Sequence, residues 1–376
     1  MMRFALMLCA LFLAACTPTG SPRAQSPGLP FAVTDPQELI VLTSEDPAVL
    51  IERAAALGYR VRAVHPLPQL DDTLVVFGIP DGVTIPDAIV QIEEAVPGVT
   101  AGAHHLYALQ ADDSGGRAYA AAMIGWPPNG CIARARVGLL DSGVMPDAPG
   151  LIDGRITQRA FTGSTAPPAT DHGTRMAEIL VGPGGLRGTT LYSANVIDPA
   201  RGGGDMAGVV AILRGVEWLA ENGVDIVNIS LAGPRNKLLD RALGQAATDG
   251  MTLIAAAGNE GPTQPPQYPA AFPFVLAVTA VDRDGAIYRN AIRGGHIDIA
   301  APGVDILLAA NGRLTVSSGT SMAAPFVTNV VAADPTLATL SVNALRATLA
   351  RRATDLGAPG RDPTFGAGLL QAGDGC

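Results

Sequence analysis

Near its C-terminal end the chain carries Ser317-Ser318-Gly319-Thr320-Ser321-Met322-Ala323-Ala324-Pro325, between an extended segment and a run of small apolar residues. The glycine permits a sharp turn, and the helix-forming residues after it place Ser321 in the first turn of a helix. Backbone N–H groups without helical partners and the positive end of the helix dipole favour a developing oxyanion there. Ser321 is therefore a candidate nucleophile, although a serine at this position can also simply cap the helix.

Three further polar residues stand at strand ends or near a helix start. Asp141 directly follows an apolar run, His172 precedes a predicted helix, and Asn259 ends another apolar run. Each has an ordinary structural explanation when taken alone: a turn, a structural histidine or a cap. Together with Ser321 they follow the order Asp, His, Asn, Ser, and a nucleophile, a base and an orienting acid are what acyl transfer needs.

These segments resemble the motifs of the subtilisin-like serine peptidases, or subtilases. The matching segments are Asp141-Ser142-Gly143, His172-Gly173-Thr174, Val227-Asn228-Ile229-Ser230-Leu231, Gly258-Asn259, Ala301-Pro302-Gly303 and Gly319-Thr320-Ser321-Met322-Ala323-Ala324-Pro325. The resemblance runs from about Arg134 to the end of the chain, and the order Asp, His, Ser is that of subtilisin.

The resemblance implies a role for each of the four residues. Ser321 attacks the peptide carbonyl, His172 takes the proton and returns it to the leaving amine, and Asp141 fixes the histidine tautomer. The Asn259 side-chain amide and the Ser321 backbone N–H form the oxyanion hole. The chain would therefore hydrolyse peptide bonds through an acyl-enzyme intermediate.

Two further segments are implied to bind substrate. The edge that pairs with an extended substrate comprises Ser230, Leu231, Ala232 and Gly233, and the wall of the primary specificity pocket comprises Ala256, Ala257 and Gly258. Gln267, which precedes Tyr268-Pro269, corresponds to a residue near the floor of that pocket. A glutamine there either shortens the pocket or offers it hydrogen bonds.

The chain departs from the family pattern at several neighbouring positions. Arg175 stands where the family usually has a second histidine, Phe326 replaces another histidine, and Asn329 replaces a glycine. The glycine-rich connection Val181–Arg187 offers no carboxylate or amide side chain, whereas calcium needs six to eight oxygen ligands. We expect no calcium in this connection, no other metal and no cofactor.

The pattern of apolar runs predicts an α/β fold. Buried parallel strands are expected at residues 136–140, 191–196, 226–230, 252–257 and 275–280. Helices are expected from near Arg175, over Met206–Asn222 with Asp205 as cap, and over Lys237–Asp249 with Asn236 as cap. Right-handed crossovers give a subtilisin-like doubly wound, mostly parallel sheet with helices on both faces.

A smaller α+β domain is predicted upstream, over residues 37–110. Strands at 38–42, 59–64, 74–79 and 105–109, with helices at 47–57 and 86–96, give a ferredoxin-like order. Before a subtilase-like domain this unit resembles an intramolecular propeptide whose tail, Gly102–Leu109, lies in the cleft. A permanent binding or spacer domain is the alternative. His104 and His105 are expected at the surface.

The segment 111–130 is polar and rich in glycine and proline, as expected of a processing linker before a catalytic domain at 131–376. We expect cleavage between about Leu109 and Tyr119. Cys131 and Cys376 remain after the N-terminal cysteines are accounted for, and in an oxidising compartment they are expected to form a disulfide; two unpaired thiols are the alternative.

The first residues have the pattern of a secretory signal, with Arg3 before a short apolar run. Residues 1–16 end in Leu13-Ala14-Ala15-Cys16, which resembles a bacterial lipobox, so Cys16 is expected to carry lipid; an ordinary signal peptide is the alternative. Thr17 is not the Asp associated with inner-membrane retention, which favours the outer membrane. Residues 17–36 are rich in proline and serine and are expected to form a spacer.

The composition agrees with a globular enzyme. The chain has 376 residues, 48% hydrophobic and 16% charged, with a formal net charge of −9. This length suffices for two or three domains, and an acidic chain does not favour a nucleic-acid partner. We expect a monomer whose partners are peptide or protein substrates, its own propeptide and, through the lipid, a membrane.

The sequence thus predicts a lipid-anchored serine endopeptidase of the bacterial cell envelope, secreted across the inner membrane and made as a self-processing proenzyme. The alternative is a catalytically silent relative that binds peptides through its cleft. A lipase or esterase of the α/β-hydrolase type requires Gly-X-Ser-X-Gly and the order Ser, acid, His, which the position of Ser321 does not match.

Overall fold

The computed structural model describes residues 33, 35–109, 112–113, 119–145, 147–151, 155–163, 168–199, 205–308 and 314–376. The predicted signal segment, Cys16 and nearly all of the spacer lie outside these residues, as does most of segment 110–118. Within the part of the chain that is described, no helix is both long and apolar enough to cross a membrane.

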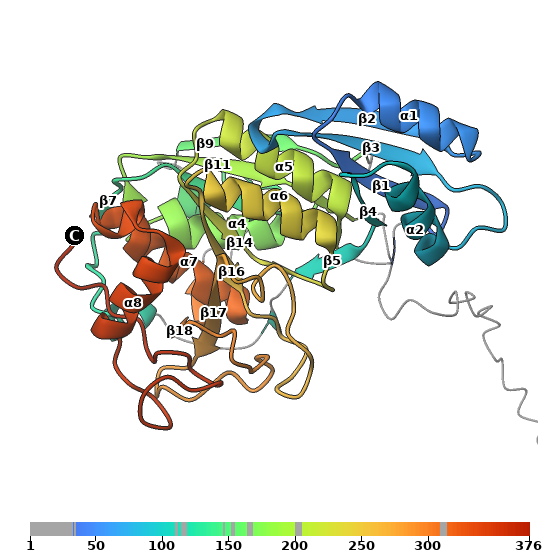
Figure 1. The fold of residues 1–376 in the computed structure, drawn as a ribbon. Coiled ribbons are helices and arrows are strands. Elements are labelled where there is room, and N and C mark those ends of the chain that lie inside the picture. Colours follow the sequence, from blue (N-terminus) through green and yellow to red (C-terminus); the bar gives the residue numbers. More distant parts are fainter. Residues whose placement is uncertain are drawn as a thin grey trace, which may run out of the picture. The chain divides into compact units, whose positions relative to one another are not determined.

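The larger domain is built on a seven-stranded parallel sheet (Figure 1). Its strands, in chain order, are β8 (Val137–Asp141), β9 (Arg155–Ala160), β11 (Thr190–Asn195), β14 (Ile226–Ile229), β16 (Thr252–Ala256), β17 (Val275–Val281) and β18 (Ile299–Pro302). Their spatial order is β18-β17-β16-β14-β8-β11-β9, and every neighbouring pair is parallel. The doubly wound parallel sheet predicted from the apolar runs is confirmed; its edge strands β9 and β18 were not predicted.

Helices cover both faces of this sheet. Successive side chains of a strand point to opposite faces, and Leu139 and Leu140 of β8 accordingly belong to two different hydrophobic clusters. One cluster contains helices α4 (Asp171–Val181), α7 (Thr320–Ala333) and α8 (Val342–Arg352), and the other contains α5 (Val209–Glu221) and α6 (Lys237–Thr248).

Two predicted helix starts are wrong and one is confirmed. Residues Met206–Gly208 form strand β13, so α5 begins only at Val209, with Gly208 rather than Asp205 as its N-cap. Helix α4 begins at Asp171, which places His172 inside its first turn. Asn236 caps α6 as predicted, because its Oδ1 accepts from the N–H groups of the second and third helical residues.

The smaller domain is an antiparallel sheet of order β2-β3-β1-β4 with two helices. The elements are β1 (Glu38–Thr43), α1 (Pro47–Ala56), β2 (Arg60–Leu67), β3 (Asp72–Gly78), α2 (Ile85–Ala95) and β4 (Thr100–Ala103). This is the predicted ferredoxin-like order. Its last strand is nevertheless Thr100–Ala103 and not the predicted 105–109, since Leu106–Leu109 forms β5, which pairs with the larger domain.

The smaller domain packs on helices α5 and α6 (Figure 1). One face of its sheet contributes Ile40, Leu42, Leu74 and Val76 to the hydrophobic cluster that these helices share. Both domains therefore bury apolar surface against each other, the main favourable term in such association.

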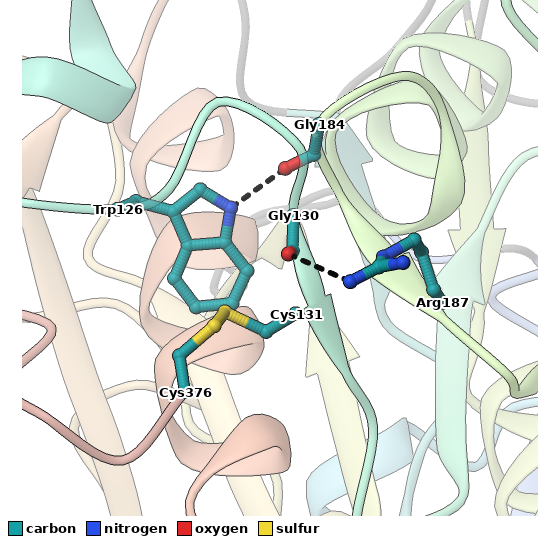
Figure 2. The surroundings of a disulfide bond; sticks show 6 residues. All are labelled: Trp126, Gly130, Cys131, Gly184, Arg187 and Cys376. Atoms are coloured by element: carbon teal, nitrogen blue, oxygen red, sulfur yellow. Dashed lines mark hydrogen bonds between the residues drawn. A yellow bond between two sulfur atoms is a disulfide. The ribbon is translucent and has the colours of Figure 1, made fainter.

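A disulfide joins Cys131 at the start of the larger domain to Cys376, with 5.4 Å between the two Cα atoms (Figure 2). Nearby, the Trp126 indole N–H donates to the Gly184 carbonyl at 2.6 Å, and Arg187 donates to the Gly130 carbonyl at 3.4 Å (Figure 2). The segment 126–131 is thus fixed both covalently and by hydrogen bonds.

Candidate active site

Three predicted residues meet in one hydrogen-bonded chain. The Nδ1 atom of His172 lies 2.8 and 2.9 Å from the two carboxylate oxygens of Asp141, and its Nε2 lies 3.1 Å from Ser321 Oγ. Asp141 and Ser321 are fully buried, and His172 is 7% exposed. A carboxylate only accepts, so Nδ1–H donates to Asp141 and Nε2 is left to accept from the Ser321 hydroxyl.

The elements that carry these residues explain their proximity. Asp141 ends β8, which lies in the sheet between β11 and β14, whereas His172 and Ser321 lie in the first turns of α4 and α7. These two helices pack against each other in one hydrophobic cluster. Functional residues of doubly wound sheets are expected at such carboxyl ends of strands and adjoining helix starts.

Ser142 ties Asp141 to the helix of His172. Its backbone N–H donates to Asp141 Oδ1 at 2.6 Å, and its Oγ accepts from the Gly173 N–H at 2.8 Å. Position 173 has no room for a side chain, because a Cβ there would lie 2.4 Å from the Ser142 carbonyl oxygen. The close approach of the two segments that carry the carboxylate and the imidazole therefore depends on this backbone contact.

Asn259 is oriented by Thr320, the residue before the serine. Its Oδ1 accepts from the Thr320 N–H at 3.0 Å and from the Thr320 hydroxyl at 2.9 Å, while the Gly258 N–H donates to that hydroxyl at 3.1 Å. A backbone N–H cannot pair with an amide NH₂, so the side-chain orientation follows from the bond itself. Nδ2 is thereby the donor end of an amide held beside Ser321.

The predicted substrate edge pairs with the chain's own segment. In an antiparallel ladder β5 lies between β13 and β15 (Leu231–Ala232), with Tyr107 opposite Ala207, Ala108 opposite both Met206 and Ala232, and Leu109 opposite Leu231. The flanking predicted residues face other contacts: the Ser230 hydroxyl accepts from Asn228, and Gly233 exchanges backbone hydrogen bonds with Tyr268. An extended peptide thus fits between these two strands.

Tyr107 anchors this segment. Its ring is fully buried, its hydroxyl donates to the Pro234 carbonyl at 2.9 Å, and burial raises the pKa of Tyr107 above its ordinary value. A Cβ on Gly233 would come within 2.5 Å of the ring, so only glycine leaves room for it.

The predicted pocket wall lies beside Asn259. Ala256 ends β16, and Ala256 and Ala257 are fully buried. Gly258 has a positive φ of 109°, and a Cβ there would lie 2.4 Å from Gln267 Oε1. The Gln267 amide therefore lies directly against Gly258.

The expectation that His104 lies at the surface is wrong. The residue is 6% exposed and sits between the two domains, where Nδ1 lies 2.9 Å from Glu38 Oε2 and Nε2 accepts from the Val210 N–H at 3.4 Å. The hydrogen bond from His104 lowers the pKa of Glu38. His105 is half-buried, 3.2 Å from the Asn236 side chain, and burial lowers the pKa of His105.

Beyond β5 the chain pairs with the strand that precedes Ser321. Strand β6 (Asp112–Asp113) pairs antiparallel with β20 (Thr315–Ser318), with Asp113 opposite Ser317 and Asp112 opposite Ser318. Only Gln110 and Ala111 separate β5 from β6 in the sequence.

For metals, the described residues contain no group of three or more His, Cys, Asp or Glu side chains that could hold an ion.

The profile of the subtilase family matches residues 134–368. The chain belongs to this family. Among curated proteins, this subtilase is 31% identical over 249 residues to the minor extracellular protease Epr of Bacillus subtilis, an alignment covering 63% of this chain and 37% of Epr. It is 35% identical over 252 residues to a thermostable alkaline protease of Halalkalibacterium halodurans, covering 64% of this chain and 66% of that protein. It is 32% identical over 241 residues to subtilisin DY of Bacillus licheniformis, an alignment covering 60% of this chain and 85% of subtilisin DY.

The fold of this subtilase is similar to the crystal structure of fervidolysin from Fervidobacterium pennivorans. The TM-score is 0.74 at 22% sequence identity, over 89% of this chain and 60% of that chain. The chain thus spans less than two thirds of fervidolysin and of the first two curated relatives.

Sequence reasoning gave no role to two residues that the structure places at the site. Thr320 holds the Asn259 amide, and Ser142 links Asp141 to Gly173. Both belong to motifs recognised in the sequence, but a neutral hydroxyl has many uses, and only the contacts reveal which one applies.

Proposed function

We propose that this subtilase is a serine endopeptidase whose reacting groups are Ser321, His172 and Asp141. The observation that carries the proposal is the unbroken hydrogen-bond chain from carboxylate to imidazole to hydroxyl. His172 Nε2 takes the hydroxyl proton as Ser321 Oγ bonds to the substrate carbonyl carbon, and Asp141 stabilises the imidazolium that forms. The same proton then goes to the leaving amine, and water releases the acyl group by the reverse sequence.

The negative oxygen of the tetrahedral intermediate is bound by Asn259 Nδ2 and the Ser321 backbone N–H. The contacts from Thr320 support this role, since an amide whose oxygen is already held needs no reorganisation when charge develops. Because the chain of hydrogen bonds is complete, a catalytically silent peptide-binding protein is not favoured.

The proposal includes self-processing. The smaller domain is the propeptide, and its tail, β5, occupies the cleft as an extended substrate does. Two contacts support this reading: β5 pairs with β15 on one side of the site, and β6 pairs with β20, which leads directly into Gly319 and Ser321. We therefore propose that the cut falls between Leu109 and Asp112, a narrower interval than the sequence alone allows.

Anchoring and location complete the proposal. The signal segment 1–16 and its lipobox support lipidation at Cys16 and a place in the bacterial cell envelope, with the outer membrane favoured by Thr17. The substrates are peptides or proteins that enter the cleft as extended strands, and the enzyme acts as a monomer.

The test of the proposed activity is labelling with a serine-directed fluorophosphonate. The chain is expressed without residues 1–16 as wild type, as Ser321→Ala and as His172→Ala. We expect wild type to be labelled at Ser321, His172→Ala to be labelled far more slowly, and Ser321→Ala not at all. Equal labelling of wild type and Ser321→Ala would remove the nucleophile assignment.

A further inference from the structure

Arg175 lies one turn after His172 on α4, and its side chain contacts β20, the strand that precedes Ser321. It is half-buried, and its Nη1 donates to the hydroxyl of Ser317 in β20 at 3.3 Å. The family resemblance leads us to expect a histidine at this position, whereas this chain carries a fixed positive charge there. The proposed function uses neither the charge nor the contact.

Strand β20 holds the part of a substrate that follows the cut. In the chain's own ladder, residues up to Leu109 pair with β15, and residues from Asp112 pair with β20. If cleavage falls between them, as proposed above, β20 binds the leaving side. This step rests on the proposed function.

The register separates two substrate positions on β20. Residues directly opposite in an antiparallel pair place their side chains on the same face of the sheet, with Cβ atoms about 4.5–5.5 Å apart. A substrate residue opposite Ser317 therefore shares the face on which Arg175 contacts the Ser317 hydroxyl. A residue opposite Ser318 lies on the other face, where the Ser318 hydroxyl contacts Asp305 Oδ1 at 3.3 Å.

We propose that Arg175 is a specificity-determining residue that selects substrates with a carboxylate side chain at the position opposite Ser317, downstream of the cut. A guanidinium is charged at every working pH and matches a carboxylate with paired N–H donors. The charge beside Ser317 is positive and the charge beside Ser318 is negative, so the two adjacent positions differ in sign. The chain's own residue at the Ser317 register is Asp113.

The experiment compares three fluorogenic peptides on the processed wild-type enzyme. The parent peptide carries the sequence of residues 107–114, Tyr-Ala-Leu-Gln-Ala-Asp-Asp-Ser, between a fluorophore and a quencher. One variant has Asn in place of the residue equivalent to Asp113, and the matched control has Asn in place of the residue equivalent to Asp112. Mass spectrometry of the products locates the cut.

We expect Asn at the position of Asp113 to lower kcat/KM about 5- to 30-fold, mainly through KM, because a partly desolvated charge pair is lost. Asn at the position of Asp112 leaves kcat/KM within about twofold, and 0.5 M salt narrows the difference between the peptides because it screens the pair. Arg175→Gln cleaves all three peptides at similar rates, and Arg175→Lys keeps part of the preference.

Equal kcat/KM for the parent and the peptide altered at Asp113 overturns the assignment of Arg175, as does a preference that survives in Arg175→Gln. The peptide comparison needs no variant protein, so it tests the preference for a carboxylate opposite Ser317 even if Arg175→Gln fails to fold. Failure of wild type to cleave any of the three peptides would instead contradict the proposed endopeptidase, and this inference with it.

Discussion

At the scale of single residues, Asn259 has its side-chain amide oriented by two hydrogen bonds from Thr320. Replacing it by alanine removes the Nδ2 donor from the developing oxyanion. Loss of one such donor typically lowers turnover about 10²–10³-fold, so we expect Asn259→Ala to lose that much in kcat while its circular dichroism spectrum stays that of the parent. Steady-state kinetics on the parent peptide measures the loss.

The matched control for this prediction is Asn259→Asp. It keeps the oxygen that accepts from Thr320 but presents a second carboxylate oxygen to the oxyanion, and we expect a loss at least as large as that of alanine. Cleavage by either variant at the parent rate would show that the oxyanion is bound elsewhere.

If Ala256, Ala257 and Gly258 form the wall of a specificity pocket, as the family resemblance implies, Gln267 lies where it would limit what enters that pocket. Its amide oxygen lies against Gly258, in the wall that also contains Ala256 and Ala257. Gln267→Gly removes that side chain, so we expect cleavage after phenylalanine to rise relative to cleavage after alanine, about tenfold if roughly two methylene-sized groups gain room. A peptide pair that differs only in the residue before the cut measures the ratio. An unchanged ratio would mean that Gln267 does not reach the substrate.

The sequence was sufficient to single out Asp141, His172, Asn259 and Ser321 as candidates, because each stands in a segment that resembles a family motif, at a strand end or helix start. It was insufficient for Thr320 and Ser142, whose roles are contacts with residues far away in the chain. The prediction for His104 was wrong for the same reason: a histidine in Ala103-His104-His105-Leu106 gives no local sign that Glu38 and Val210 will contact it.

At the scale of elements, strands with continuous apolar runs were predicted well and edge strands poorly. Strand β9 is mostly exposed and carries no apolar run, so nothing local marks it. Residues Met206–Gly208 were taken into a helix because they precede a helical pattern, yet they form β13 with β5 as a neighbour. That pairing partner is a segment that follows the smaller domain much earlier in the chain, and the local sequence contains no information about it.

One ion pair between elements of the two domains offers a further prediction. Arg241 of α6 donates through Nε and Nη2 to the carboxylate of Asp72 in β3, at 2.9 and 2.5 Å, and the Asp72 side chain is 2% exposed. Removing one member of such a pair leaves a buried charge, which costs about 3–5 kcal/mol. We expect Arg241→Met to lower the free energy of unfolding of the smaller domain by about that amount in the full Ser321→Ala chain, measured by urea denaturation.

The effect of Arg241→Met should depend on pH. Burial raises the pKa of Asp72, against the opposing charge of Arg241. Because the folded-state pKa of Asp72 is raised, its ionised carboxylate lowers the free energy of unfolding most at pH values above that pKa. Protonation of Asp72 removes this destabilisation. The deficit of Arg241→Met should therefore shrink as pH falls through the pKa of Asp72, and Asp72→Asn should show a smaller deficit without this dependence. A deficit independent of pH would contradict the account.

At the scale of the whole molecule, the disulfide closes a loop of most of the larger domain. Cys131 and Cys376 are 245 residues apart in the sequence, and cross-links over long loops restrict the unfolded chain most. We expect Cys131→Ser with Cys376→Ser to lower the free energy of unfolding of the Ser321→Ala chain by about 2–5 kcal/mol. Dithiothreitol should lower the free energy of unfolding of the Ser321→Ala chain to that of the chain that also lacks both cysteines, and it should not change the latter. Equal free energies of unfolding for the oxidised Ser321→Ala chain and the cysteine-free chain would contradict this prediction.

The site itself is a property of the whole chain. Asp141, His172 and Ser321 come from three elements of the larger domain, while β5, which pairs with the predicted substrate edge, follows the last strand of the smaller domain. If the smaller domain is a propeptide, as proposed, Ser321 must cleave its own chain just after β5.

The most direct test is the intact mass of the purified chain expressed without residues 1–16, as wild type and as Ser321→Ala. We expect wild type to shorten to a product that begins between Gln110 and Asp112, and Ser321→Ala to keep its full mass under the same conditions. Shortening of Ser321→Ala at the same bond, or a wild type that is labelled by fluorophosphonate yet never shortens, would contradict this expectation.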